Sequence, residues 1–92
     1  MADERIRILI ADDHVVVREG TRQLLEHEPD LVVVAEAGDG EEAVRLVGET
    51  RPDVAIMDIN MPKLDGIEAT KRIKELYPKT AVLVLSAYDD DQ

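Results

Sequence analysis

Acidic and hydroxyl side chains follow three apolar runs of this 92-residue chain, at the point where each run ends. Asp12 and Asp13 follow the first run, Asp58 follows a later one, and Ser86 follows the last. If these runs are parallel strands, their carboxyl ends meet at one edge of a sheet, where α/β folds form their sites. Three carboxylates gathered there repel one another, and the repulsion is relieved by protonating one of them or by binding a divalent cation.

Ligands that are all oxygen atoms favour Mg²⁺, which prefers octahedral coordination and keeps several waters. A carboxylate beside Mg²⁺ can also attack a phosphoryl group and form an aspartyl-phosphate, while the cation neutralises charge on the transferred oxygens. A single Asp after a strand is, however, often only a turn residue or a helix cap. The spacing of Asp12, Asp13 and Asp58 alone therefore leaves a functional carboxylate site and a purely structural role both open.

Alternating apolar runs and helix-like stretches predict the elements that position these residues. Runs rich in β-branched residues predict strands at 6–11, 31–35, 54–57 and 81–85. Helical spacing predicts helices at about 16–27 and 67–77, with a third that starts after Asp39 and is ended by Gly48 and Pro52. This order predicts a parallel α/β sheet with right-handed crossovers and helices on both faces.

The apolar positions also predict which face of each helix turns inward. Asp39 and Glu42 read as a capping box for the middle helix. The residues expected to face inward are Val17, Thr21, Leu24 and Leu25 in the first helix and Ile67, Thr70, Ile73 and Tyr77 in the last. The residues of the first helix expected to face away from the core are Arg18, Glu19, Arg22 and Glu26.

Composition excludes several functional classes. Eleven Lys and Arg against 21 Asp and Glu give a net charge of −10, which disfavours binding to nucleic-acid phosphates or to an anionic membrane surface. The absence of cysteine excludes disulfides and thiolate sites. Apolar runs of about five residues are too short to span a bilayer, and residues 1–5 contain no signal-peptide core. An intracellular, cytoplasmic protein is expected.

Four segments around the acidic residues resemble the receiver domain of bacterial two-component response regulators. They are Ile8-Leu9-Ile10-Ala11-Asp12-Asp13-His14, Met57-Asp58-Ile59-Asn60-Met61-Pro62, Leu64-Asp65-Gly66 and Leu83-Val84-Leu85-Ser86-Ala87. The Asp-Asp-His run followed by Val17-Arg18-Glu19-Gly20, together with Pro29-Asp30 and Val34-Ala35-Glu36-Ala37, is similar to the NarL/FixJ branch. Members of that branch usually join the receiver to a DNA-binding domain.

The resemblance implies a role for each site residue. Asp58 would accept a phosphoryl group from the phosphohistidine of a sensor histidine kinase. Asp13 would bind Mg²⁺ directly, Asp12 mainly through water, and Asp58 and the backbone carbonyl of Asn60 would complete the protein ligands. Ser86 would hydrogen-bond a phosphoryl oxygen. His14 is expected only to flank this site.

The resemblance also implies a flavodoxin-like, CheY-like sheet of strand order 2-1-3-4-5. Residues 1–92 are expected to form a single truncated receiver domain of four strands and three helices, in the order 2-1-3-4. The family's fourth helix, fifth strand with its lysine, and last helix are not assigned to any residue. The strand at 81–85 would then be an exposed apolar edge, and such an edge invites self-association or exchange of elements between copies.

The expected function is therefore that of a phosphoacceptor module from a transcriptional regulator, with Mg²⁺ as cofactor and without independent enzyme activity. One alternative is an inactive, self-associating fragment that cannot complete phosphotransfer. Another is a Mg²⁺-dependent phosphohydrolase with Asp58 as nucleophile, but Asn60 stands where such an enzyme needs an acid. The sequence does not identify the partner kinase, its signal or the controlled genes.

Overall fold

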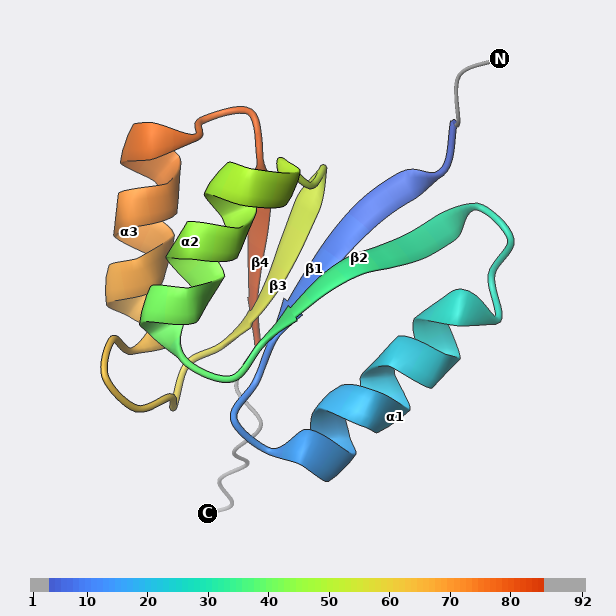
Figure 1. Cartoon of the computed structure of the whole chain (residues 1–92), viewed down its shortest axis with the longest axis horizontal. Helices are drawn as coiled ribbons and strands as arrows, with labels where there is room; N and C mark the ends of the chain where they lie inside the picture. The colour runs from blue at the N-terminus through green and yellow to red at the C-terminus, as the bar shows by residue number, and fades with distance from the viewer. Residues whose placement is uncertain (1–3, 86–92) are drawn as a thin grey trace.

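Seven elements follow one another in the computed structural model, which describes residues 4–85. The strands are β1 (Ile6–Ala11), β2 (Leu31–Ala37), β3 (Val54–Asp58) and β4 (Ala81–Leu85). The helices are α1 (Val15–Glu26), α2 (Gly40–Thr50) and α3 (Gly66–Leu76). The strands form one parallel sheet of order β2-β1-β3-β4 (Figure 1). The predicted fold class is confirmed.

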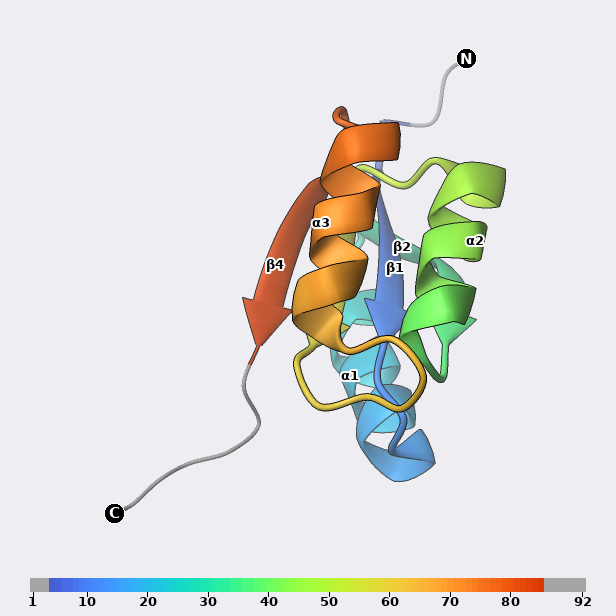
Figure 2. The ribbon, with the colours of Figure 1, turned by 90° about the vertical axis from the view of Figure 1, so that its left-hand side faces the viewer.

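Helices lie on both faces of the sheet. The α2 and α3 helices lie side by side on one face, and α1 lies on the other, against β1 and β2 (Figures 1 and 2). The buried core is aliphatic, as expected from a chain with two aromatic residues. It consists of Leu9, Ala11, Ala37, Ala43, Val47, Ala55, Met57, Met61, Ala69 and Ile73. Its many alanines let α2 and α3 approach the sheet closely.

Two aspartates begin the helices of that face. The Asp39 carboxylate accepts the backbone N–H of Glu42 at 2.8 Å, as the capping box predicts. The Glu42 carboxylate reaches back to the N–H of Gly38 at 2.8 Å. Asp65 caps α3 in the same way, through the N–H of Glu68 at 2.9 Å. These caps set the start of both helices next to the carboxyl edge of the sheet.

Two predicted boundaries are wrong. Strand β2 continues to Ala37, because a register shift between Ile8 and Leu9 of β1 lets β2 stay paired to its end. Helix α2 passes through Gly48 to Thr50 and ends where Arg51 adopts a left-handed conformation (φ 47°). Pro52 follows the end of the helix as predicted, but Gly48 does not end it. Gly48 makes room for Tyr77, whose hydroxyl would overlap a Cβ at that position.

The predicted inner face of α1 is right only in part, since Val17 and Thr21 line a cleft against the sheet. No residue of α1 is buried, and Leu24 is 74% exposed. Arg18, expected on the outer face, has only 18% of its side chain exposed, because it and Arg22 pair with Glu36 of β2. The polar side of α1 therefore contacts the edge of the sheet.

The predicted face of α3 needs one correction. Ile67 is 53% exposed, whereas Ala69 and Ile73 are fully buried. Ile67 lies about 200° around the helix from Ala69, so it falls on the side opposite the buried residues Ala69 and Ile73.

Strand β4 is a free edge within residues 4–85, as predicted. Its residues Leu83, Val84 and Leu85 are 51%, 37% and 46% exposed. None of the three helices in the described part of the chain has the length and apolar character needed to cross a bilayer.

Candidate metal centre

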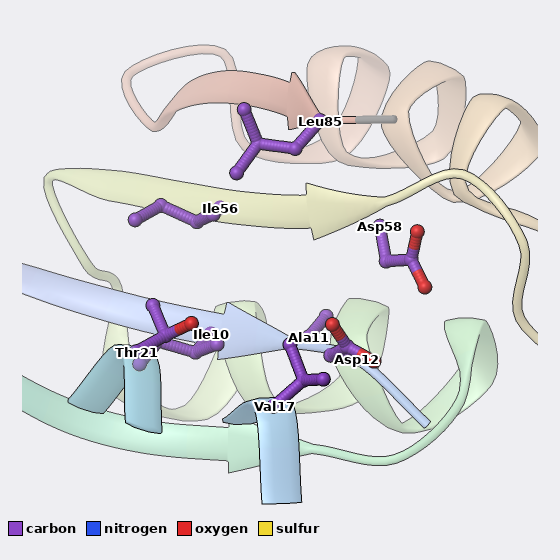
Figure 3. A pocket seen from close by; sticks show the side chains of 8 residues that line it. All are labelled: Ile10, Ala11, Asp12, Val17, Thr21, Ile56, Asp58 and Leu85. Carbon is purple, nitrogen blue, oxygen red and sulfur yellow. The ribbon is translucent and has the colours of Figure 1, made fainter. Parts of the chain in front are cut away.

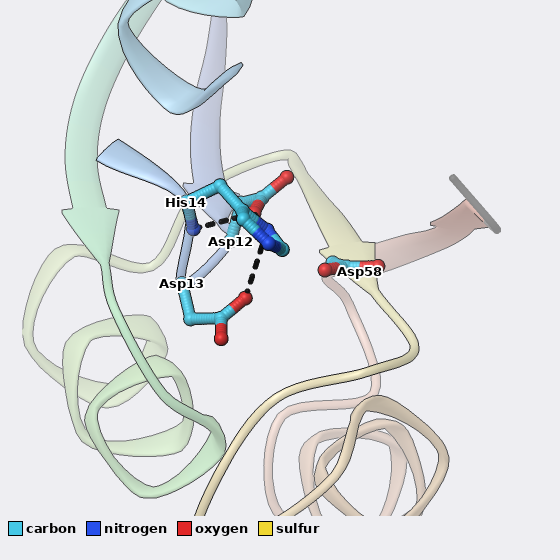
Figure 4. A group of neighbouring side chains, drawn as sticks. All are labelled: Asp12, Asp13, His14 and Asp58. Atoms are coloured by element: carbon cyan, nitrogen blue, oxygen red, sulfur yellow. Dashed lines mark hydrogen bonds and ion pairs between the residues drawn. The ribbon is translucent and has the colours of Figure 1, made fainter. Parts of the chain in front are cut away.

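The three aspartates predicted from the ends of the runs meet at one edge of the sheet. Asp12 and Asp13 follow β1, and Asp58 is the last residue of the neighbouring β3. The pairing of Ala11 with Met57 puts the two strand ends level. One ligand atom from each aspartate and from His14 lies within 4.8 Å of all the others (Figure 4).

Asp58 is the most buried member of this cluster, at 6% exposure. Burial is the main cause that raises the pKa of its carboxyl group, and the negative charge of Asp12 acts in the same direction. The N–H of Asn60 donates to Asp58 Oδ1 over a long 3.4 Å and favours the charged form only weakly. The ionised Asp58 therefore lacks strong stabilisation and is suited to a cation.

His14 belongs to the cluster itself, whereas the sequence predicted only a residue that flanks the site. Its Nδ1 lies 3.1 Å from an oxygen of Asp12 and 3.1 Å from an oxygen of Asp13. Its backbone N–H also donates to Asp12 Oδ1 at 2.8 Å. The hydrogen bond with Asp12, followed by the charge of Asp13, raises the pKa of His14. The adjacency of His14 to two aspartates was the available signal.

The other two predicted site residues are Asn60 and Ser86. Asn60 is an exposed residue just after β3, next to Asp58 in the loop that leads to α3. That loop closes against β3, because Gly66 donates its N–H to the carbonyl of Ile59 at 2.9 Å. A Cβ on Gly66 would overlap the Asp58 carbonyl, so glycine is needed at this position. Ser86 lies outside the described residues.

An apolar cleft of about 220 Å³ opens beside the carboxylates. Asp12 and Asp58 lie at one end of it, with Val17 and Thr21 of α1 on one wall (Figure 3). Ile10, Ile56 and Leu85 line the side formed by the sheet (Figure 3). The acidic site is therefore continuous with the partly covered face of the sheet.

The donor set fits a hard divalent cation. Three carboxylates offer oxygen ligands from two strand ends, and His14 can neutralise at most one of their charges when protonated. Mg²⁺ keeps several waters and needs only a few protein oxygens, which suits a cluster whose Asp13 is exposed. The group is a candidate Mg²⁺ site.

A protein-family model matches most of the chain. The model described as response regulator receiver domain matches residues 8–92. The transcriptional regulatory protein DegU of Brevibacillus brevis is 51% identical over 89 residues, which are 97% of this chain and 38% of the relative. The chain thus spans about two-fifths of the length of that curated relative.

Solved structures show the same likeness. The signal receiver domain of the putative response regulator NarL from Mycobacterium tuberculosis superposes with a TM-score of 0.89 at 37% identity, covering 95% of this chain and 70% of that one. A chain from the CheX-CheY-BeF3-Mg complex of Borrelia burgdorferi superposes with a TM-score of 0.85 at 31% identity, covering 95% and 66%.

Proposed function

Because the chain belongs to the receiver-domain family of response regulators, of the NarL and DegU type, we propose that it is a phosphoacceptor module phosphorylated on Asp58. The observation that carries the proposal is the buried Asp58 facing Asp12 and Asp13 at the carboxyl edge of the sheet. Residues 1–92 act in it as a single receiver domain. The module has no separate catalytic activity of its own toward a further substrate.

The proposed reaction is a phosphoryl transfer. A carboxylate oxygen of Asp58 forms a bond to phosphorus while the bond from phosphorus to the imidazole nitrogen of a phosphohistidine breaks, and that nitrogen keeps the electron pair. Bound Mg²⁺ would supply charge neutralisation at the transferred oxygens. Asp13 would hold the cation directly, Asp12 would act mainly through water, and Asp58 and the backbone carbonyl of Asn60 would complete the protein ligands.

The donor of the phosphoryl group is proposed to be a sensor histidine kinase. The proposed location of the transfer is the cytoplasm. Ser86 is proposed to hydrogen-bond a phosphoryl oxygen once Asp58 is modified. The relatives named as transcriptional regulatory proteins support a parent protein that controls transcription. The net charge of −10 supports protein partners rather than direct contact of this chain with nucleic acid.

The test is intact mass after incubation with Mg²⁺ and acetyl phosphate. One added phosphate is expected, and it should disappear in Asp58→Asn and in EDTA. Asp65→Asn is the matched control in the same loop, because asparagine caps a helix as well as aspartate does. An adduct that persists in Asp58→Asn would overturn the assignment of the acceptor.

A second proposed property is self-association through β4. The exposed apolar side chains of Leu83, Val84 and Leu85 on a free strand edge support it. Light scattering at tens of micromolar should give a dimer mass for the chain and a monomer mass for Leu83→Lys. Leu76→Lys, at a 59% exposed position of α3, should remain dimeric. A stable monomer of the unmodified chain would contradict this proposal.

A further inference from the structure

The Arg18 side chain joins helix α1 to the backbone of an acidic site residue. Its Nη1 donates to the carbonyl oxygen of Asp12 at 2.6 Å and lies 3.5 Å from the carbonyl oxygen of Ala37. The guanidinium is mostly enclosed, at 18% exposure of the side chain. A charged hydrogen bond of this kind is stronger than one between neutral groups, so it holds the backbone at this point firmly.

The backbone of Asp12 is held from both sides. Its N–H donates to the carbonyl of Ala37 at 3.0 Å, while its own carbonyl accepts from Arg18. Both peptide planes that flank the Asp12 Cα atom are therefore fixed, and they set the direction in which the Cβ leaves the backbone. That direction points the Asp12 carboxylate toward Asp58 and His14.

Arg18 is itself held in place by Glu36 of β2. The Glu36 carboxylate accepts from Arg18 Nε at 3.2 Å and pairs with Arg22 Nε at 3.1 Å. Arg22 also pairs with Glu19 and Glu26 along α1. These contacts link β2 through Arg18 to the loop after β1. Arg18 bonds the backbone of Asp12 and not the carboxylates of the acidic site.

We propose that Arg18 is a positioning residue for the divalent-cation site: it fixes the Asp12 backbone so that the carboxylates are arranged before the cation arrives. This inference rests on the proposed function. Preorganised ligands bind a metal more tightly, because less freedom is lost on binding. Arginine suits the role, since its planar fork donates in two directions while the single Lys ammonium is a point charge.

The direction of the effect separates positioning from simple electrostatics. Neutralising Arg18 makes the neighbourhood of the site more negative, and Coulomb attraction alone would then strengthen cation binding. A positioning role predicts the opposite result, namely weaker binding. The sign of the change in Mg²⁺ affinity therefore decides between the two.

The experiment is a calorimetric Mg²⁺ titration of the whole chain and its variants. Arg18→Met should weaken Mg²⁺ binding by roughly tenfold, as is typical for groups that orient metal ligands. Arg18→Lys should fall between that variant and the unmodified chain. Arg22→Met is the matched control, because it removes the same charge and another partner of Glu36 without removing a bond to Asp12, and its Mg²⁺ affinity should not fall.

A second readout excludes a merely structural effect. Urea unfolding in EDTA gives the stability of each variant, and a loss of affinity that tracks stability across Arg18→Met and Arg22→Met would overturn the inference. At saturating Mg²⁺, phosphorylation of Arg18→Met by acetyl phosphate should recover, because the defect lies in cation binding. Failure to recover would also count against positioning.

The remaining outcomes distinguish this inference from the proposed function. If the unmodified chain binds no Mg²⁺, both are overturned. If it binds Mg²⁺ and Arg18→Met binds equally well or more tightly, only the role of Arg18 is overturned. Should Arg18→Met not fold, Arg18→Lys decides instead, because it keeps the positive charge and electrostatics alone then predicts no change. Loss of the guanidinium geometry should still weaken Mg²⁺ binding, and an unchanged affinity of Arg18→Lys would overturn the proposal.

Discussion

Gly40 at the start of α2 and Leu64 in the loop after β3 meet so closely that a Cβ on Gly40 would overlap the Leu64 carbonyl oxygen. The same loop carries Asn60 and connects Asp58 to α3. Lys63 of this loop lies 3.6 Å from the Asp39 carboxylate, so an ion pair accompanies the backbone contact. The position of the loop beside the acidic site therefore depends on a glycine in a different element.

Gly40→Ala should consequently destabilise the chain by about 1–3 kcal/mol, the usual cost of forcing an extra methyl group into a packed contact. The measurement is the urea midpoint at neutral pH. Gly20→Ala is the control, because Gly20 lies in the middle of α1 with no atom within 4 Å of an added Cβ. That control should stabilise by about 0.5–1 kcal/mol through helix propensity. Equal effects of both changes would show that the contact with Leu64 does not constrain the loop.

Asp58→Asn should stabilise the chain at pH 7 in EDTA. Burial, aided by the charge of Asp12, raises the pKa of Asp58, so the folded state disfavours its ionised form. Such a group reduces stability progressively as pH rises from its unfolded pKa, about 3.9, through the higher folded value. Asparagine keeps the shape and removes the charge. Urea unfolding should give a higher midpoint for the variant, and a lower midpoint would refute this account.

Mg²⁺ should reverse that ranking. A ligand at a hundred times its dissociation constant stabilises the folded state by about 2.7 kcal/mol. The unmodified chain should gain this amount at saturating Mg²⁺, and Asp58→Asn and Asp13→Asn should gain much less, because each removes a proposed ligand. Ca²⁺-free buffers and equal ionic strength, adjusted with NaCl, control for screening. An equal gain in all three chains would place the cation elsewhere.

The imidazole of His14 should titrate above its ordinary value near 6.5. The hydrogen bond with Asp12 is the main cause of the raised pKa, and the charge of Asp13 adds to it. Its contribution to stability is fully present below the unfolded pKa and is lost as pH rises through the folded one. It should be small, since 65% of the side chain is exposed.

Nuclear magnetic resonance of the His14 ring protons measures this pKa directly. Asp12→Asn should lower it, and saturating Mg²⁺ should lower it as well, because the cation neutralises the same carboxylates. His14→Gln should remove the corresponding part of the pH dependence of the urea midpoint. A His14 pKa that does not respond to Asp12→Asn would contradict the geometry of the cluster.

The sequence predicted the features that depend on short motifs or on the ends of strands. The cap at Asp39 and the gathering of Asp12 and Asp58 follow from short motifs and from strand ends in a parallel sheet. Arg18 turns toward the sheet because it pairs with Glu36, which lies eighteen residues later in β2. The periodicity of a single helix carries no information about a partner in another element. Gly48 was misread for the same reason, because its partner Tyr77 is distant in sequence.

Thr80 should be the threonine most sensitive to loss of its hydroxyl. It is 3% exposed, and its Oγ1 donates at 2.8 Å to the carbonyl of Pro52, which joins the starts of β3 and β4. Thr80→Val keeps the shape but deprives a buried carbonyl of this donor, so urea unfolding should show a loss of about 1–3 kcal/mol. Thr50→Val is the control: its hydroxyl donates at 2.8 Å to Leu46 within α2, where the helix already supplies a donor. If Thr50→Val costs as much as Thr80→Val, then side-chain conformation, not the link between β3 and β4, governs both effects.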